Sequence, residues 1–266
     1  MGIKGRTLKE AKTKRNFLRK IVRVMSLIMG IVFLVWVGIL GGAIYKQFFQ
    51  KIYDLPPHYK DAVPSSWAGG VFRIEVRDKS RVVYGTGFSI GPQLVVTNAH
   101  VVGRSGIIVR LYTDAEKEVL AGRVVWIGKY KNDRLYDFAI INLGQKNKRA
   151  QKQVLEMTDK PMKVQDGILA MGFNQGRTNL SFLKGDITSL TRKDQLYQYD
   201  AMVNMGCSGG PLISTRYKKV VGIIVGEDDH TKGNRVSTGT KLAIPISEFL
   251  KRVPNTYTTH IGKVKK

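Results

Sequence analysis

Short apolar runs separated by polar turns dominate the chain after residue 65. Val71–Val76 alternates between apolar and charged residues, as a strand with one buried face does. Frequent β-branched residues and 28 glycines suit many short strands joined by turns. The pattern predicts an all-β domain over residues 66–250 with one short terminal helix, for which Ser247 would be the cap. The apolar runs that support this are Gly106–Val109, Arg123–Ile127 and Val220–Val225.

A different pattern occupies the N-terminal segment. Residues 24–45 contain no charged side chain, and 22 helical residues span about 33 Å, enough for the hydrocarbon core of a bilayer. We expect a transmembrane helix there, followed by a tether over residues 46–65. An apolar run this long exceeds the usual signal-peptide core, although Gly41 and Ala43 keep a cleaved signal peptide open as the alternative.

Charge predicts the orientation of this segment. The first 23 residues carry nine Lys or Arg against Glu10 alone, and basic flanks stay in the cytoplasm. We therefore expect a single-pass protein of the cytoplasmic (inner) membrane whose folded domain lies outside the cytoplasm. Residues 251–266 are interpreted as a basic C-terminal tail.

The net charge of +24 also bears on possible partners. Much of the excess lies in the cytoplasmic flank, and no aromatic interleaving supports base stacking, so we expect no nucleic-acid partner. The loop at 146–152 is either a solvated linker or a contact for anionic lipid or an acidic partner. No spacing of His, Cys or acidic residues suits a metal, and we expect no cofactor.

Three short segments at the ends of apolar runs carry the candidate chemistry: Thr97–His100, Tyr136–Ile140 and Gly206–Pro211. They supply a nucleophile in Ser208, a general base in His100 and a carboxylate in Asp137 that would orient the base. A serine hydroxyl is a weak nucleophile at neutral pH and needs such a base, and the carboxylate fixes the imidazole tautomer. This combination predicts hydrolysis of a peptide bond without a metal.

Glycines around Ser208 have a separate predicted task. Gly206 would let the backbone turn so that its N–H and that of Ser208 converge where the oxyanion of a tetrahedral intermediate forms. Cys207 is the alternative nucleophile. The Gly-Gly pair should follow the nucleophile directly, however, and Ser208 occupies that position, one residue after Cys207. We interpret it as a small buried residue, and a single cysteine permits no internal disulfide.

These residues resemble the trypsin-like serine peptidases and, within them, the HtrA/Deg branch. The resemblance rests on Gly85–Phe88, Leu94–Val102, Asp137–Ile141, Asp200–Leu212 and Lys241–Ile246. It covers roughly residues 66–250 and implies two six-stranded antiparallel β-barrels with the active site between them. The family also makes a trimer conceivable.

Two departures from the family limit which of its properties we expect in this chain. Cys207 stands where that branch often has Asn and where digestive trypsins have an Asp that pairs with a new N-terminus, so we expect no activation by that ion pair. Sixteen residues follow Leu250, and we expect no PDZ domain on this chain.

The resemblance also suggests the specificity. Basic-specific relatives carry an acid six residues before the nucleophile, where this chain has Met202, and a neutral pocket leaves a buried cation unpaired. The substrate would lie beside Gly222–Gly226, including Ile223, Ile224 and Val225, and we expect cleavage after small or medium aliphatic residues. Glu227, Asp228 and Asp229 could instead serve a basic side chain.

The sequence therefore predicts a membrane-anchored serine endopeptidase that cuts extracytoplasmic proteins, in quality control or regulatory processing. The alternative is a membrane-tethered binding module that keeps the fold without turnover.

Overall fold

The computed structural model describes residues 65–78, 81–114, 119–131, 133–144, 153–190, 195–227, 241–259 and 261. The predicted basic flank, the predicted transmembrane segment at 24–45 and most of the tether lie outside these residues, as do the basic loop at 146–152 and the acids Asp228 and Asp229. None of the helices in the described part is long and apolar enough to cross a bilayer.

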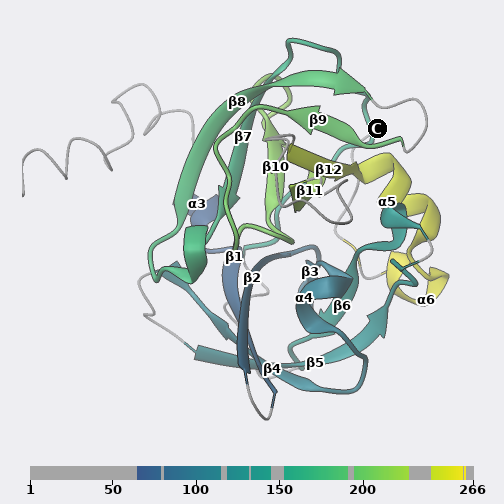
Figure 1. The fold of residues 1–266 in the computed structure, drawn as a ribbon. Coiled ribbons are helices and arrows are strands. Elements are labelled where there is room, and N and C mark those ends of the chain that lie inside the picture. The colour runs from purple at the N-terminus through teal and green to yellow at the C-terminus, as the bar shows by residue number, and fades with distance from the viewer. Residues whose placement is uncertain are drawn as a thin grey trace, which may run out of the picture. The chain divides into compact units, whose positions relative to one another are not determined.

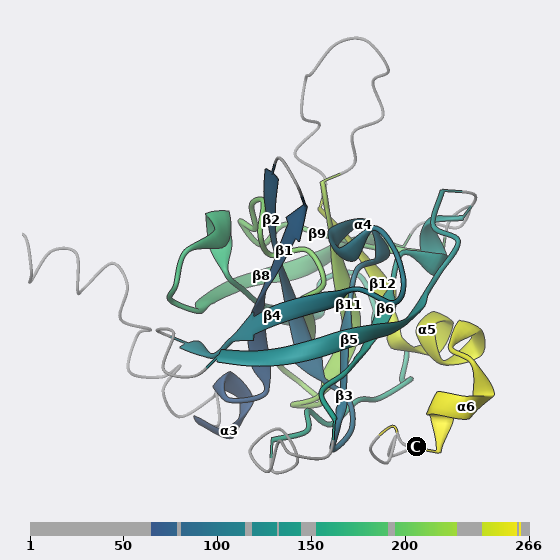
Figure 2. The same cartoon turned by 90° about the horizontal axis from the view of Figure 1, so that it is seen from below.

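The first half of the described chain closes into a six-stranded antiparallel barrel in the order β1-β2-β3-β6-β5-β4. It forms the blue and teal part of Figure 1, with its strands β4 and β5 on the side seen in Figure 2. Its strands are β1 (Val71–Asp78), β2 (Arg81–Ser89), β3 (Leu94–Thr97), β4 (Ile108–Tyr112), β5 (Val119–Ile127) and β6 (Ala139–Asn142).

The second half forms another closed antiparallel barrel, in the order β10-β11-β12-β9-β8-β7. Its strands are β7 (Gly167–Gly172), β8 (Ser181–Leu190), β9 (Tyr197–Tyr199), β10 (Pro211–Ser214), β11 (Val220–Glu227) and β12 (Lys241–Pro245). The predicted pair of six-stranded barrels is confirmed.

Short helices occur at the ends of strands. They are α3 (Ser65–Ala68), α4 (Ala99–Val102), α5 (Ile246–Arg252), α6 (Asn255–Thr258) and the 3-10 turns η2 (Arg134–Tyr136) and η4 (Asn174–Gly176). The helix expected at 247–253 is α5, but it starts one residue earlier, and Pro245 rather than Ser247 is its N-cap.

Each barrel has its own core, and a third cluster joins the two. Phe138 of the first barrel, with Met171 and Phe173 of the second, is fully buried in this shared cluster. Burying such large side chains is the main stabilising term of the fold and fixes one barrel against the other.

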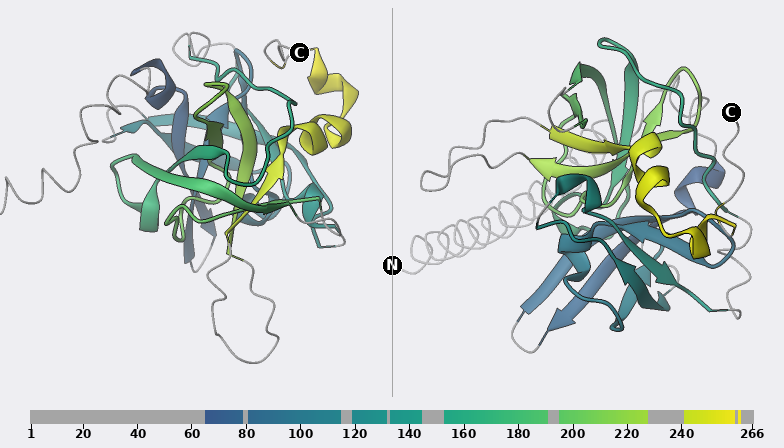
Figure 3. Two further views of the ribbon diagram at one scale, coloured as in Figure 1. Left: turned by 90° about the horizontal axis from the view of Figure 1, so that it is seen from above. Right: turned by 90° about the vertical axis from the view of Figure 1, so that its right-hand side faces the viewer.

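Helix α5 packs on this shared cluster and extends past the predicted domain end at Leu250. The ring of Phe249 meets Phe138 edge-on, with 4.9 Å between centroids, and Tyr257 donates a hydrogen bond to the Val125 carbonyl at 3.4 Å. The right view of Figure 3 shows α5 and α6 against both barrels. The start of the predicted tail is thus part of the packed domain.

Candidate active site

Strand pairing brings His100 and Asp137 together. His100 lies in α4, directly after β3, and Asp137 lies between η2 and β6, while β3 and β6 are neighbours that pair Thr97 with Ala139. His100 Nδ1 lies 2.7 Å from Asp137 Oδ2, and the His100 backbone N–H donates to Oδ1 at 2.9 Å. Two contacts from one residue fix both the position and the orientation of the carboxylate.

The surroundings of this pair favour one imidazole tautomer. Asp137 is only 5% exposed, and Asn98 Nδ2 donates to its backbone carbonyl at 2.7 Å. A proton on His100 Nδ1 satisfies Asp137 Oδ2 and leaves Nε2 as the acceptor, which is the form a general base needs. Asn98 did not emerge from the sequence as a functional residue, although it stands two positions before His100.

The turn before Ser208 has the backbone that its glycine predicts. The Cys207 N–H donates to the Asn204 carbonyl at 3.1 Å, and Gly206 has a φ of +96°. A Cβ at Gly206 would collide with the Phe173 carbonyl oxygen and would lie 2.6 Å from the Gly176 nitrogen. Only glycine fits this position, because both the dihedral angle and the space exclude a side chain.

All three carbonyls of this turn have donors. Gln175 N–H donates to Met205 O at 2.5 Å, Thr86 Oγ1 donates to Gly206 O at 2.6 Å, and Gly210 N–H donates to Cys207 O at 3.0 Å. In a trans peptide the N–H points opposite to the carbonyl, so the Gly206 and Ser208 N–H groups turn away from these donors. Neither N–H has an acceptor among the described residues.

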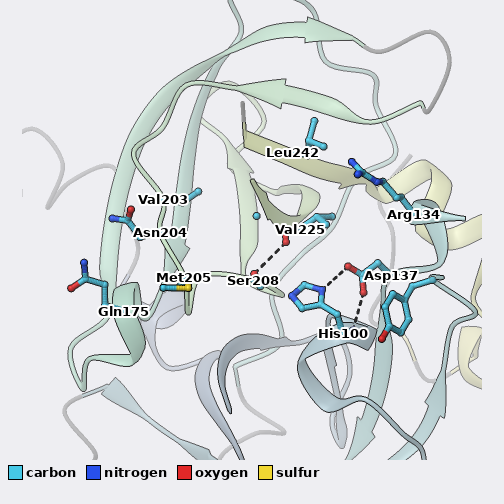
Figure 4. Close-up of a pocket in the computed structure, with 12 residues that line it drawn as sticks. His100, Arg134, Asp137, Gln175, Val203, Asn204, Met205, Ser208, Val225 and Leu242 are labelled. Atoms are coloured by element: carbon cyan, nitrogen blue, oxygen red, sulfur yellow. Dashed lines mark hydrogen bonds and ion pairs between the residues drawn. The ribbon is translucent and has the colours of Figure 1, made fainter. Parts of the chain in front are cut away.

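Ser208 shares a cavity with the pair. Figure 4 shows His100 between Ser208 and Asp137, and the three residues line one cavity of about 680 Å³. The Ser208 hydroxyl donates to the Val225 carbonyl at 3.2 Å. Rotation about χ1 is the movement that would redirect it, and catalytic hydrogen bonds commonly tighten only with substrate bound.

A β-bulge presents Val225 to Ser208. The register between β11 and β12 shifts between Ile224 and Gly226, so Val225 stands without a direct partner. Gly226 has a φ of +113°, and a Cβ there would lie 3.3 Å from Ser208 Oγ. The bulge therefore turns the end of β11 toward the site.

The predicted substrate-binding residues are not all brought into the cavity. Val225 lines it, but Ile223 and Ile224 are fully buried and their backbones already pair within the sheet. Met202 is 80% exposed and does not line the cavity, whereas its neighbour Val203 does. Gly226, the end of the predicted substrate strand, also lines the cavity. Lining residues that sequence reasoning missed are Tyr130, Arg134, Gln175, Val203, Asn204, Met205 and Leu242.

Cys207 points into the second barrel instead of the cavity. Its side chain is 1% exposed and packs against Gly172, where a Cβ would lie 3.0 Å from the sulfur. Burial raises the pKa of the Cys207 thiol to about 11, so it is a thiol rather than a thiolate at neutral pH. No group of three or more His, Cys, Asp or Glu side chains in the described part could hold a metal ion.

A double-barrel fold with Ser, His and Asp at one cavity defines the class of trypsin-like peptidases. The chain belongs to that family: the family model described as a trypsin-like peptidase domain matches residues 85–223.

Curated relatives agree with the resemblance to the HtrA/Deg branch. "Putative protease Do-like 13" of Arabidopsis thaliana is 29% identical over 61% of this chain and 32% of its own length. "Putative serine protease HhoA" of Synechocystis sp. is 27% identical over 82% of this chain and 49% of its own length. The chain thus spans between about a third and half of the length of these relatives.

Solved structures share the fold. The active form of the Rv3671c protease from M. tuberculosis has a TM-score of 0.60 and 23% identity, covering 79% of this chain and 88% of that one. The serine endoprotease from Yersinia pestis has a TM-score of 0.57 and 22% identity, covering 74% of this chain and 66% of that one.

Proposed function

We propose that this protein is a serine endopeptidase in which Ser208 is the nucleophile, His100 the general base and Asp137 the residue that orients the base. The observation that carries the proposal is the double hydrogen bond between Asp137 and His100 in a cavity that Ser208 also lines. This arrangement leaves His100 Nε2 available on the side of the nucleophile.

The reaction then runs through an acyl-enzyme. Ser208 Oγ attacks the scissile carbonyl carbon while His100 Nε2 takes the hydroxyl proton, and the carbonyl oxygen becomes an oxyanion bound by the N–H groups of Gly206 and Ser208. The C–N bond breaks as His100 returns the proton to the leaving amine. Water, deprotonated by His100, then attacks the ester carbon, the bond to Ser208 Oγ breaks, and His100 returns the proton to Ser208 Oγ as the acid leaves.

Substrate binding would also reposition the nucleophile. An extended peptide that donates a backbone N–H to the Val225 carbonyl would take the acceptor that Ser208 Oγ now uses. The hydroxyl would then rotate to His100. Val225 has no direct partner in β12, and the pairing of β11 with β10 ends at Ile223, so substrate pairing would start at Val225 and Gly226 rather than at Gly222.

A fluorophosphonate probe tests the enzyme directly. We expect labelling of the wild-type protein and none of Ser208→Ala, because phosphonylation needs a serine activated by its base. Equal labelling of both proteins would contradict the peptidase assignment.

One observation favours the second candidate, a binding module without turnover. The Ser208 hydroxyl is directed to Val225 and not to His100. That interpretation predicts that the fluorophosphonate probe does not label the wild type. It also predicts that wild type and Ser208→Ala bind a peptide equally, which a fluorescence-anisotropy assay of the two proteins would reveal.

For specificity we propose cleavage after small or medium aliphatic residues. Val203, Val225 and Leu242 give the cavity apolar walls, which suit such side chains. A peptide-library profile of the full chain in detergent would test this, and a profile dominated by Lys or Arg before the cleaved bond would refute it.

We further propose that residues 24–45 anchor the protein in the cytoplasmic membrane with the peptidase domain outside, where its substrates would be extracytoplasmic proteins. The uncharged run and its basic flank support this proposal. Protease added to intact bacterial spheroplasts should digest the domain, whereas full protection would contradict the orientation. Recovery of a soluble chain that starts near Ile44 would indicate signal cleavage instead.

A further inference from the structure

Arg73 connects the outer face of the first barrel to the turn before the nucleophile. It lies in β1, is 6% exposed and donates from Nη1 to the Gly176 carbonyl at 3.3 Å, across 103 residues of sequence. Gly176 is the last residue of η4. The middle residue of this turn, Gln175, donates its backbone N–H to the Met205 carbonyl. The contact therefore reaches the peptide that carries the Gly206 N–H.

Aromatic rings hold the guanidinium in place. The Arg73 carbon Cζ lies 4.5 Å from the ring centroid of Tyr112 and 5.1 Å from that of Tyr84. Tyr84 comes from β2 and Tyr112 from β4, the strands on either side of β1. Such a planar cation packed on aromatic faces loses little freedom when it makes its hydrogen bond.

A buried carboxylate, Glu75, holds the Tyr112 ring of this cluster in place. Glu75 is 4% exposed and accepts from the Tyr112 hydroxyl at 3.4 Å. Burial alone would raise the pKa of Glu75, but the hydrogen bond and charge of Arg77 outweigh it and lower the pKa. Glu75 is therefore an anion at neutral pH and a firm acceptor for Tyr112.

Turn η4 is packed against both the cluster and the nucleophile turn. A Cβ at Gly176 would lie 2.9 Å from the Tyr84 ring, and Gly176 has a φ of +66°. On the other side, a Cβ at Gly206 would meet the Gly176 nitrogen at 2.6 Å. Because η4 has no free space on either side, any displacement of η4 would move its neighbours. The Gln175 N–H bonded to Met205 O would move with it and tilt the Met205–Gly206 peptide.

From these contacts we infer that Arg73 is a positioning residue for the oxyanion site: it fixes η4 so that Gln175 holds Met205 O and the Gly206 N–H faces the developing oxyanion. The inference rests on the proposed peptidase function. Loss of one oxyanion donor typically costs about 100- to 1000-fold in kcat, and a misdirected donor a part of that. We expect Arg73→Met to lower kcat by roughly 10- to 100-fold.

The test compares Arg73→Met with Arg110→Met in the full chain. Arg110 lies on the same face, is 55% exposed and approaches the same Glu75 at 3.8 Å, but no contact links it to η4 in the described part. Rates are normalised to the folded fraction from urea denaturation. We expect Arg73→Met to lower kcat while KM stays within about twofold, and Arg110→Met to match the wild type.

Two further measurements separate positioning from general destabilisation. A peptide boronic acid, which forms a tetrahedral adduct at Ser208, should lose affinity for Arg73→Met as kcat falls, whereas the product acid should not. Gly176→Ala, whose Cβ would push η4 away from the Tyr84 ring, should lower kcat similarly, and the double variant should be little worse than either.

The outcomes distinguish the two claims. An active wild type with unchanged kcat in Arg73→Met, or equal losses in Arg73→Met and Arg110→Met, would overturn the positioning role and leave the peptidase intact. A wild type without turnover and without fluorophosphonate labelling would overturn both. If Arg73→Met does not fold, Arg73→Lys keeps the charge without the planar contact and should show the same loss in kcat with unchanged KM.

Discussion

The two sides of the active site are held by different means. On the base side, around the proposed base His100, the residues His100, Asp137 and Asn98 are joined by hydrogen bonds in which side chains take part, and all three belong to the first barrel. On the nucleophile side, around the proposed nucleophile Ser208, backbone carbonyls are held by groups from both barrels, Thr86 from the first and Gln175 from the second. One side depends on which side chains are present, the other on where the backbone is placed.

This difference separates what a substitution does on each side. Replacing a side chain of the base side removes a chemical group from the reaction. Replacing a residue behind the nucleophile turn leaves every reacting group in place and changes the direction of a donor. We therefore expect losses of different size and different kinetic signature on the two sides.

The largest effect should come from the reacting groups. Ser208→Ala and His100→Ala should each lower kcat by about 10⁶-fold, since the pair acts as a unit. Asp137→Asn should cost about 10⁴-fold, because the amide presents the wrong tautomer of His100. Steady-state hydrolysis of a peptide substrate measures this. Asp159→Asn, which changes an exposed carboxylate, is the control, and retained turnover in Ser208→Ala would refute the assignment.

The next effect should come from the backbone of the nucleophile turn. Gly206→Ala should lower kcat by about 100- to 1000-fold, because the new Cβ collides with the Phe173 carbonyl and moves an oxyanion donor. Gly144→Ala imposes a similar φ of +71° where nothing lies within 4 Å, and it should leave kcat unchanged. Equal losses in both variants would show that strain alone, and not the donor, explains the effect.

Sequence reasoning succeeded where side chains carry the information. The alternating and apolar runs predicted an all-β domain, and the resemblance to trypsin-like peptidases implied its two barrels. The motifs led to His100 and Asp137, which the β3–β6 pairing brings together. It could not find Arg73, Gln175 or the bulge at Val225, because these act through backbone groups far apart in the chain. A count of six residues before Ser208 does not record that Met202 is exposed while its neighbour Val203 lines the cavity, and the role of Met202 in substrate binding stays a prediction.

The cavity wall offers a smaller test of the same contrast. Val203→Ala should change the ratio of kcat/KM between substrates with Ala and with Val before the cleaved bond by about 10-fold or more, since added methylene groups in an apolar pocket discriminate by roughly 10- to 200-fold. Met202→Ala should change that ratio less than about twofold, because its side chain is exposed. A larger change in Met202→Ala than in Val203→Ala would show that Met202 lines the specificity pocket, as the sequence predicts.

The smallest effect on turnover should come from Cys207, which neighbours the nucleophile but faces the core. Cys207→Ser should keep kcat within about tenfold, because the sulfur lies outside the cavity and the backbone of the turn is unchanged. Complete loss of turnover in this variant, together with retained turnover in Ser208→Ala, would instead make the thiol the nucleophile.

Alkaline titration gives Cys207 a readout of its own. The thiol has an ordinary pKa of 9.0, and burial raises it to about 11 in the folded protein. Between these values the folded state binds more protons than the unfolded state, so the free energy of unfolding should fall as pH rises from about 9 to 11. A serine hydroxyl at this position does not titrate in that range, so Cys207→Ser should show a shallower fall in urea denaturation.

Iodoacetamide should also alkylate the folded wild type at about pH 8 much more slowly than the unfolded chain, because the thiolate is the reactive form. Identical slopes and fast alkylation of the folded protein would place the sulfur in solvent and contradict its position against Gly172.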